Sequence, residues 1–235
     1  MRRSPAPGVD LGVYVAALPL LVRNPAIIVV PLLMLIVGVL VGRIFPGGGL
    51  GGFASLFTTL LSLFGLGAAC IMADDAWRHG HASFESGWSD AQRRAGDIFM
   101  ASIGVTLLVT VAQFVGAFLG PLALLLVAAV FIFLIWVIPA AAIGGIPGGG
   151  AIQVSIDRVR ATPLPAALAA IVALLLVFLA RSVALEIAAE LVPYTGDAFI
   201  VEALVGALLQ AIVIAYVALI LAKTYADSAF RAPRW

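Results

Sequence analysis

The chain has few charged residues, and this shortage excludes several classes of protein. Asp, Glu, Lys and Arg make up 11% of the 235 residues, whereas hydrophobic residues make up 63%. A soluble globular domain contains about 25% charged residues, so this composition does not fit one. The net charge of +1 lacks the basic excess of nucleic-acid-binding proteins. We therefore expect no nucleic-acid partner.

A soluble domain and a disulfide are also missing. The longest stretch between apolar segments is 73–97, which is too short to bury a core of its own. The single cysteine, Cys70, has no intrachain partner for a disulfide. The segment 1–5 is not followed by the short apolar stretch and cleavage site of a signal peptide, so we expect it to be retained. Any function is therefore predicted to lie in the apolar part of the chain and at its two faces.

What the chain does have is six long apolar segments. They are 25–45, 53–72, 98–119, 121–143, 164–180 and 199–222. About 20 apolar residues in a helix cross the hydrocarbon core of a bilayer. The sequence therefore predicts an all-α polytopic membrane protein with six transmembrane helices, forming a single transmembrane domain over 1–235 in contact with the lipid bilayer. Gly120 and Pro121 leave almost no loop between the third and fourth segments, which predicts a tight antiparallel hairpin.

Basic residues fall mostly on one side of the predicted membrane. Of the 13 Lys and Arg residues, only Arg43 and Arg181 belong to the second side. Lys and Arg are retained in the cytoplasm when helices insert, so the side that holds the other eleven is predicted to be cytoplasmic. With six spans, both termini then lie in the cytoplasm.

Three short segments precede the odd-numbered spans and are predicted to be interfacial helices. They are 9–23, 84–94 and 151–160. In the second, Phe84, Trp88 and Ala91 recur at spacings of three and four opposite a polar side. We therefore expect short amphipathic helices at the cytoplasmic interface. Three units of one such helix plus one transmembrane hairpin follow, over 9–75, 83–143 and 151–227.

Several short motifs resemble those of a known group of proteins. They are the segment 80–84 followed by 87–88, Pro139 near the end of the fourth span, and the segment 151–155 followed by Arg158. These motifs resemble prokaryotic six-helix membrane proteins of unassigned function, related to the membrane domain of glycerophosphoryl diester phosphodiesterases. The resemblance covers most of the chain and implies a six-helix fold with amphipathic cytoplasmic helices in a prokaryotic cytoplasmic (inner) membrane. It implies no reaction, because the phosphodiesterase chemistry resides in a separate soluble domain.

Polar residues inside the predicted spans are few, and such residues are costly in a membrane. Counted from the cytoplasmic ends of the third and sixth spans, Gln113 and Gln210 lie at depths that differ by roughly 4 Å. We expect the two amides to hydrogen-bond across a helix interface, either as a structural clamp or as part of a solute path. Hydroxyl groups available as further partners are those of Thr58, Thr59, Ser62, Thr106 and Thr110.

A charged rim is predicted on the outer side, at Arg181, Glu186, Glu190 and Glu202. Glu186 and Glu190 lie four residues apart on one helix face and repel each other, so they need a cation, a basic partner surface or water. Arg181 is placed to reach Glu202 across the last two spans. The rim is thus a solvated surface with structural pairing, a docking surface for another subunit, or an entry for an ion or substrate.

The densest group of metal-ligand residue types is Asp74, Asp75, His79 and His81. Asp75 and His79 share a face if the second span continues as a helix, a spacing that can hold a metal ion. Polar residues beside a Trp and an Arg are expected at the end of a span for anchoring alone, and this is the favoured interpretation. The chain has no HExxH motif and no nucleophile elbow, so we expect no catalytic residues and no cofactor.

The sequence favours a non-enzymatic integral membrane protein, acting as an accessory or scaffolding component or as a subunit of a membrane assembly. The spans lack the charges that coupled transport usually requires. The alternative is a small-solute or lipid transporter, which the repeated hairpins and the glutamine pair favour. A membrane enzyme built on the Asp and His cluster ranks last. The pairs Gly38/Gly42 and Gly116/Gly120 permit close helix contact within the chain, with protein partners or in a homo-oligomer.

Overall fold

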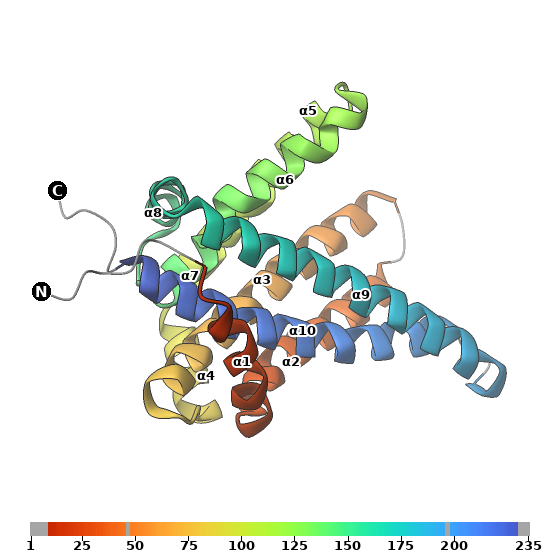
Figure 1. Ribbon diagram of the computed structural model, residues 1–235. Helices are drawn as coiled ribbons and strands as arrows, with labels where there is room; N and C mark the ends of the chain where they lie inside the picture. Colours follow the sequence, from red (N-terminus) through yellow and green to blue (C-terminus); the bar gives the residue numbers. More distant parts are fainter. Residues whose placement is uncertain (1–8, 46–47, 196–197, 230–235) are drawn as a thin grey trace, which may run out of the picture.

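The computed structural model describes residues 9–45, 48–195 and 198–229, and every regular element among them is helical (Figure 1). Six helical segments are long and apolar enough to cross a membrane, which confirms the predicted all-α polytopic fold. They are Ala26–Ile44, Gly51–His79, Ala95–Gly116, Gly120–Ala142, Pro163–Leu191 and Val201–Ser228. The segment 1–5 lies outside the described residues.

Four long helices form the main group of the fold. They are α2 (Ala26–Ile44), α3 (Gly48–His79), α9 (Pro163–Thr195) and α10 (Ala198–Ala229). α2 packs on α3 and α9 packs on α10, while α10 also packs on both α2 and α3. α10 is therefore the central helix of this group.

The third and fourth spans form a separate hairpin. It consists of α5 (Ala95–Gly116), the short 3₁₀ helix η1 (Gly120–Leu122), α6 (Ala123–Leu134) and α7 (Val137–Ala142). The turn is as tight as predicted, because Gly120 adopts a φ of +56° that favours glycine. The tip of the hairpin diverges from α9 and α10 (Figure 1). The hairpin is packed on the rest of the molecule mainly through α3 and α8, with further contacts to α4, α9 and α10.

Three shorter helices lie at the positions predicted for interfacial helices. They are α1 (Leu11–Arg23), α4 (Phe84–Arg93) and α8 (Gly148–Ala161). α8 begins three residues before the predicted start, where Gly148 lies so close to Met100 that an added Cβ would stand 2.7 Å from the Met100 Cβ. Each short helix is followed by a hairpin of two spans, while the division of the domain into three such units stays a prediction.

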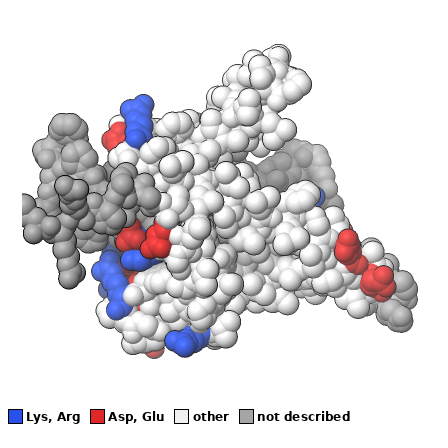
Figure 2. Space-filling view, viewed as in Figure 1, with Lys and Arg blue, Asp and Glu red and all other residues white. Residues whose placement is uncertain are grey.

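Charged side chains gather at the two ends of the molecule and leave most of the middle uncharged (Figure 2). We call the end that carries α1, α4 and α8 the basic end, and the end that carries Arg43 and Glu202 the opposite end. Glu202 and Lys223 are 21 residues apart on α10, which is about 31 Å of helix. This distance matches the hydrocarbon core of a bilayer, about 30 Å, so the two charged ends fit the two membrane surfaces.

The fourth span is interrupted near the basic end, a feature that the apolar pattern did not predict. α6 ends at Leu134 and α7 begins at Val137. Pro139 explains the break, since it has no N–H group and its ring crowds the carbonyl of Ile135. α8 supplies partners for backbone groups at the break. The Ser155 hydroxyl accepts a hydrogen bond from the Trp136 N–H at 3.2 Å and donates one to the Phe133 carbonyl at 2.7 Å.

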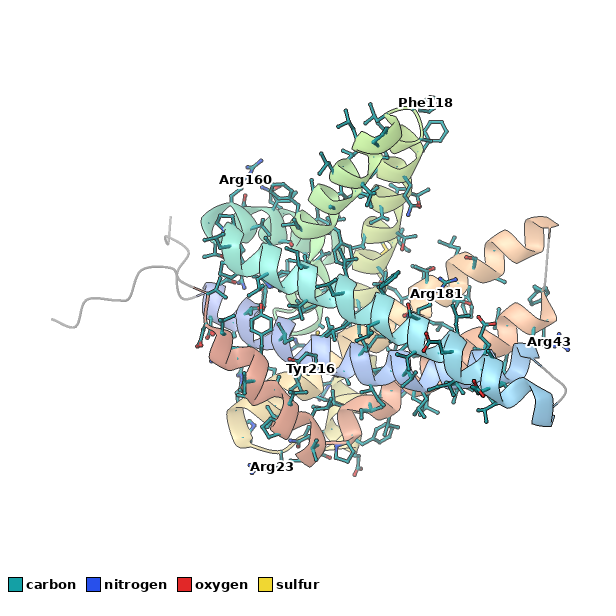
Figure 3. The ribbon with its side chains drawn as sticks, turned by 45° about the vertical axis from the view of Figure 1, so that its right-hand side comes forward. Arg23, Arg43, Phe118, Arg160, Arg181 and Tyr216 are labelled. Carbon is teal, nitrogen blue, oxygen red and sulfur yellow. The ribbon has the colours of Figure 1, made fainter. Side chains whose placement is uncertain are left out.

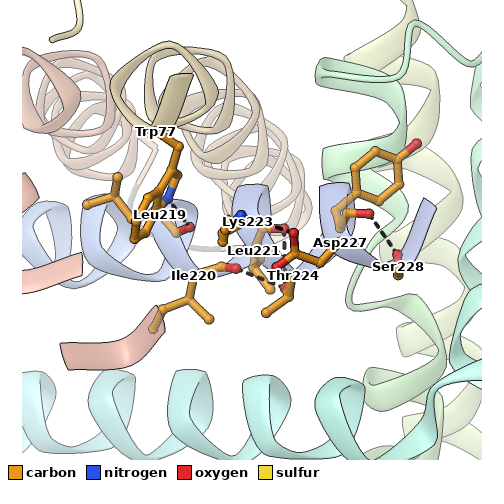
Figure 4. A network of polar contacts seen from close by, with 9 residues as sticks. Trp77, Leu219, Ile220, Leu221, Lys223, Thr224, Asp227 and Ser228 are labelled. Carbon is orange, nitrogen blue, oxygen red and sulfur yellow. Dashed lines mark hydrogen bonds and ion pairs between the residues drawn. The ribbon is translucent and has the colours of Figure 1, made fainter. Parts of the chain in front are cut away.

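Side chains that bond to the backbone tie the basic end together. Asn24, only 3% exposed, accepts a hydrogen bond from the Ala82 N–H at 2.7 Å and donates to the Leu20 carbonyl at 2.9 Å. The Trp77 indole donates to the Leu219 carbonyl at 2.9 Å, which joins α3 to α10 (Figure 4). These contacts connect elements that are distant in sequence and fix the bases of the hairpins.

Candidate functional site

Gln210 in α10 lines three cavities. The largest, of about 690 Å³, lies between α2, α3 and α10, and we call it the polar cavity. A second of about 200 Å³ lies between α9 and α10. The third, of about 250 Å³, is bounded by α3, α5, α6, α7, α9 and α10, and we call it the apolar cavity. No other polar side chain of the described residues lines all three.

Two helix faces supply the polar groups of the polar cavity. On α10, Glu202 and Gln210 are eight residues apart with Gly206 midway, so all three lie on one face. On α3, Ser55 and Thr59 are four residues apart and share a face with Thr58. The repeats of four residues thus set a row of hydroxyl groups opposite a carboxylate and an amide.

Small residues of α2 and α3 make room for this cavity. Gly38, Gly42, Gly51 and Ala54 line it. A Cβ added to Gly42 would meet no atom within 4 Å, whereas one added to Gly38 would stand 2.6 Å from the Thr58 Cγ2. Gly38 is therefore a close packing contact between α2 and α3, and Gly42 borders open space.

Three of the five polar side chains that line the polar cavity, those of Thr58, Thr59 and Glu202, offer acceptors, while Ser55 and Gln210 can also donate. The Thr58 hydroxyl donates to the Ala54 carbonyl at 2.8 Å, and the Thr59 hydroxyl donates to the Ser55 carbonyl at 2.9 Å. Because each hydroxyl has one hydrogen, the oxygens retain only lone pairs for a ligand. An ionised Glu202 is likewise an acceptor only. The ligand that complements such a wall carries N–H or O–H donors or a positive charge.

Depth along α10 defines the entrance of the polar cavity. Glu202 lies at the opposite end, and Gln210 lies eight residues further along the helix, about 12 Å deeper. Beyond Gln210, the apolar cavity contains a single hydroxyl, that of Ser62, among aliphatic and aromatic side chains. Gln210 therefore stands between a polar entrance and an apolar interior.

Gln113 is not brought to Gln210. It is exposed on α5, and it lines none of the three cavities. No hydrogen bond joins the two amides within the part of the chain that the structure describes. The α5–α6 hairpin diverges from α10 (Figure 1), so similar depth does not produce contact. The predicted partners Thr58, Thr59 and Ser62 do share cavities with Gln210.

The predicted outer rim separates into two parts. Arg181 and Glu202 line the same cavity between α9 and α10, although the described residues include no ion pair between them. Figure 3 shows Arg181 partway along α9. Glu186 and Glu190 are exposed on the later turns of α9 and line none of the three cavities. Only half of the rim is thus close to Gln210.

The side chains of Asp74, Asp75, His79 and His81 are not gathered into one cluster in the described part of the chain. Asp74 pairs with Arg78 at 2.8 Å. The ring centroids of His79 and His81 are 6.4 Å apart, because α3 ends between these residues and Gly80 turns the chain with a φ of +80°. Among the described residues, no three His, Cys, Asp or Glu side chains are grouped so that they could hold a metal ion.

The row Glu202, Gly206 and Gln210 was missed as a unit, although its spacing was visible in the sequence. In the sequence, the two polar residues belong to different predicted features, a rim and an amide pair. A spacing of eight residues on one helix places both on the same face, and the glycine between them leaves space for a ligand.

The chain matches no family model, no curated protein and no solved structure. The assignment of the site therefore depends on its geometry and chemistry. The resemblance to six-helix proteins related to the membrane domain of glycerophosphoryl diester phosphodiesterases stays a prediction.

Proposed function

We propose that this integral membrane protein is a non-enzymatic transporter that binds a small cationic or donor-rich solute in the polar cavity. The observation that carries the proposal is that Gln210 lines three cavities, one polar and one apolar among them. A polar side chain within a membrane span costs free energy, so such residues usually pair with another polar group or line a functional path. Gln210 at this position can pass a solute between the polar entrance and the interior.

The charge of the polar cavity supports a cationic solute such as a small primary or quaternary amine. Glu202 is the one ionisable side chain that lines it among the described residues. Arg181 lines only the neighbouring cavity between α9 and α10. A carboxylate at the entrance attracts cations, and the hydroxyl oxygens of Thr58 and Thr59 can then accept hydrogen bonds from the solute.

We further propose that the basic end faces the cytoplasm of a prokaryotic cell and that both termini lie there. The support is the excess of Lys and Arg at that end. The polar cavity would then open to the outside. An external solute would meet Glu202 first and reach Gln210 after about 12 Å.

The test is binding by purified protein in lipid nanodiscs, measured by titration calorimetry. Ethanolamine and choline are the cationic probes, and glycerol and acetate are the uncharged and anionic controls. Glu202→Gln removes the charge, and Gly42→Leu fills open space without a clash at Cβ. Both variants are expected to abolish binding of the cations. Glu190→Gln is the matched control, because Glu190 is exposed and lines none of the three cavities.

Two results would refute the proposal. One is a failure of the wild-type protein to bind any cationic probe. The other is unchanged binding by both Glu202→Gln and Gly42→Leu, since neither the loss of the charge nor the loss of cavity volume would then affect the ligand. Uptake of the bound amine into proteoliposomes then distinguishes a transporter from a protein that only binds.

An accessory subunit of a membrane assembly is the second candidate, and the α5–α6 hairpin favours it. The tip of the hairpin extends away from the four-helix group (Figure 3), and Phe118 at the tip is 78% exposed. A projecting hairpin of this kind can insert between helices of another protein. Isolation from native membranes in mild detergent tests this role. A stoichiometric partner that cross-links to position 118 supports it, and a lone bundle refutes it.

A further inference from the structure

A groove lies along the α5–α6 hairpin near the basic end, and Gln210 does not line it. It has a volume of about 450 Å³ and is formed by α5, α6 and the last turns of α8. Apart from Arg160, its lining is apolar and includes Val111 of α5, Leu126 and Leu134 of α6, and Ile156 of α8. Along α6 it extends from Leu134 to Leu126, about 12 Å. The groove therefore has the length and chemistry of part of a hydrocarbon chain.

Within the described part of the chain, Arg160 is the one charged residue that lines this groove. It follows Ile156 by one turn of α8, so both side chains face the groove, and Arg160 lies at the basic end of it. Figure 3 shows Arg160 exposed on α8. The groove thus combines an apolar floor with one guanidinium group at its end.

The Arg160 side chain is available to a ligand. Among the described residues it forms no ion pair. The nearest acid along the helix, Asp157, accepts hydrogen bonds from Gln153 at 3.2 Å on both oxygens. Arg158 differs, because its guanidinium lies 3.7 Å from the centre of the Tyr225 ring and donates to the Tyr225 carbonyl at 2.8 Å. Arg158 is thus a structural contact, while Arg160 faces outward.

We propose that this groove binds an anionic phospholipid from the leaflet at the basic end, with its phosphate on Arg160 and one acyl chain along α5 and α6. A guanidinium group matches a phosphate in geometry and charge. Arg160 lies at the basic end, which we match to a membrane surface, and lipid phosphates lie at that depth. Anionic lipids attract basic residues there. This groove shares no lining residue with the polar cavity, although Leu134 lines both the groove and the apolar cavity.

The test uses the full chain, delipidated in detergent and titrated with phosphatidylglycerol, with bound lipids counted by native mass spectrometry. Wild-type protein is expected to retain one tightly bound phosphatidylglycerol. Arg160→Gln should weaken its retention by about tenfold, the value of one lost charge-assisted contact. Val111→Trp should weaken it as well, because the indole fills the groove at a position that is already 52% exposed.

The matched control is Arg23→Gln, which removes an exposed arginine from the last turn of α1 at the same end. It should retain the lipid like the wild type, as should Arg160→Lys in large part. Equal loss in Arg23→Gln and Arg160→Gln would overturn the proposal, because it would indicate attraction by general charge. So would equal retention of phosphatidylcholine by the wild type, or unchanged retention in Val111→Trp.

Discussion

The Ser155 hydroxyl accepts a hydrogen bond from the Trp136 N–H at 3.2 Å and thereby joins α8 to the broken fourth span. Ser155 is fully buried. The same hydroxyl donates to the Phe133 carbonyl at 2.7 Å, so it bonds to both sides of the break. The interruption at Pro139 and the position of α8 therefore depend on each other.

Ser155→Ala should lower the free energy of unfolding by about 1–3 kcal/mol, because it leaves a buried N–H group without a partner. Gln153→Ala is the control, since Gln153 is exposed on the same helix and should change stability little. Thermal unfolding of both variants in the same detergent provides the measurement. Equal melting temperatures for the two variants would show that the break does not need Ser155.

The two glycines of the Gly38/Gly42 pair should respond differently to alanine. A Cβ at position 38 would stand 2.6 Å from the Thr58 Cγ2, so either the Thr58 side chain or the packing of α2 on α3 must shift. Gly38→Ala should therefore destabilise the protein by about 1–3 kcal/mol. Gly42→Ala meets no atom within 4 Å and should be close to neutral. Thermal unfolding of the pair checks this, and equal losses would contradict the packing of α2 on α3.

The orientation of the spans can be tested by labelling single cysteines in intact cells. Cys70 is fully buried, so the natural chain should give little background with a membrane-impermeant maleimide. Glu190→Cys should be labelled from outside, and Arg93→Cys only after the cells are opened, because Lys and Arg are retained inside. Labelling of both positions from the same side would refute the six-span topology.

The spans and the hairpin turn could be predicted from the sequence because their causes are local. A run of about 20 apolar residues crosses a membrane whatever lies beside it, and Gly120 with Pro121 leaves no room for a loop. The break at Pro139 also has a local cause. The apolar pattern does not reveal the break, because the residues around Pro139 are uniformly apolar and the segment is long enough to cross a membrane.

The contact between Gln113 and Gln210 could not be derived in this way. Depth in the membrane follows from counting residues, but contact also requires the direction in which each side chain points and the tilt of each hairpin. Gln113 is exposed on a hairpin that diverges from α10. Spacing within one helix is more reliable, and it relates Glu202 to Gln210 without knowledge of the tertiary fold.

The hydroxyl of Tyr14 on α1 is buried and has no hydrogen-bond partner among the described residues. It borders a small cavity of about 30 Å³ that Thr224 and Asp227 also line. Burial raises the pKa of Tyr14 above its ordinary value, and the nearby Tyr216 adds to this. The folded protein therefore keeps this phenol protonated at a pH where the unfolded chain releases the proton.

Stability should consequently fall as the pH rises above about 10, the ordinary pKa of tyrosine, because the unfolded state then binds fewer protons than the folded state. Tyr14→Phe removes the titrating group, so its melting temperature should fall less between pH 9 and pH 11, two values chosen to lie about one unit on either side of that pKa. At pH 7 the variant should be no less stable than the wild type, since the hydroxyl forms no hydrogen bond within the described chain. Parallel stability curves for the two proteins would show that Tyr14 does not titrate differently in the folded state.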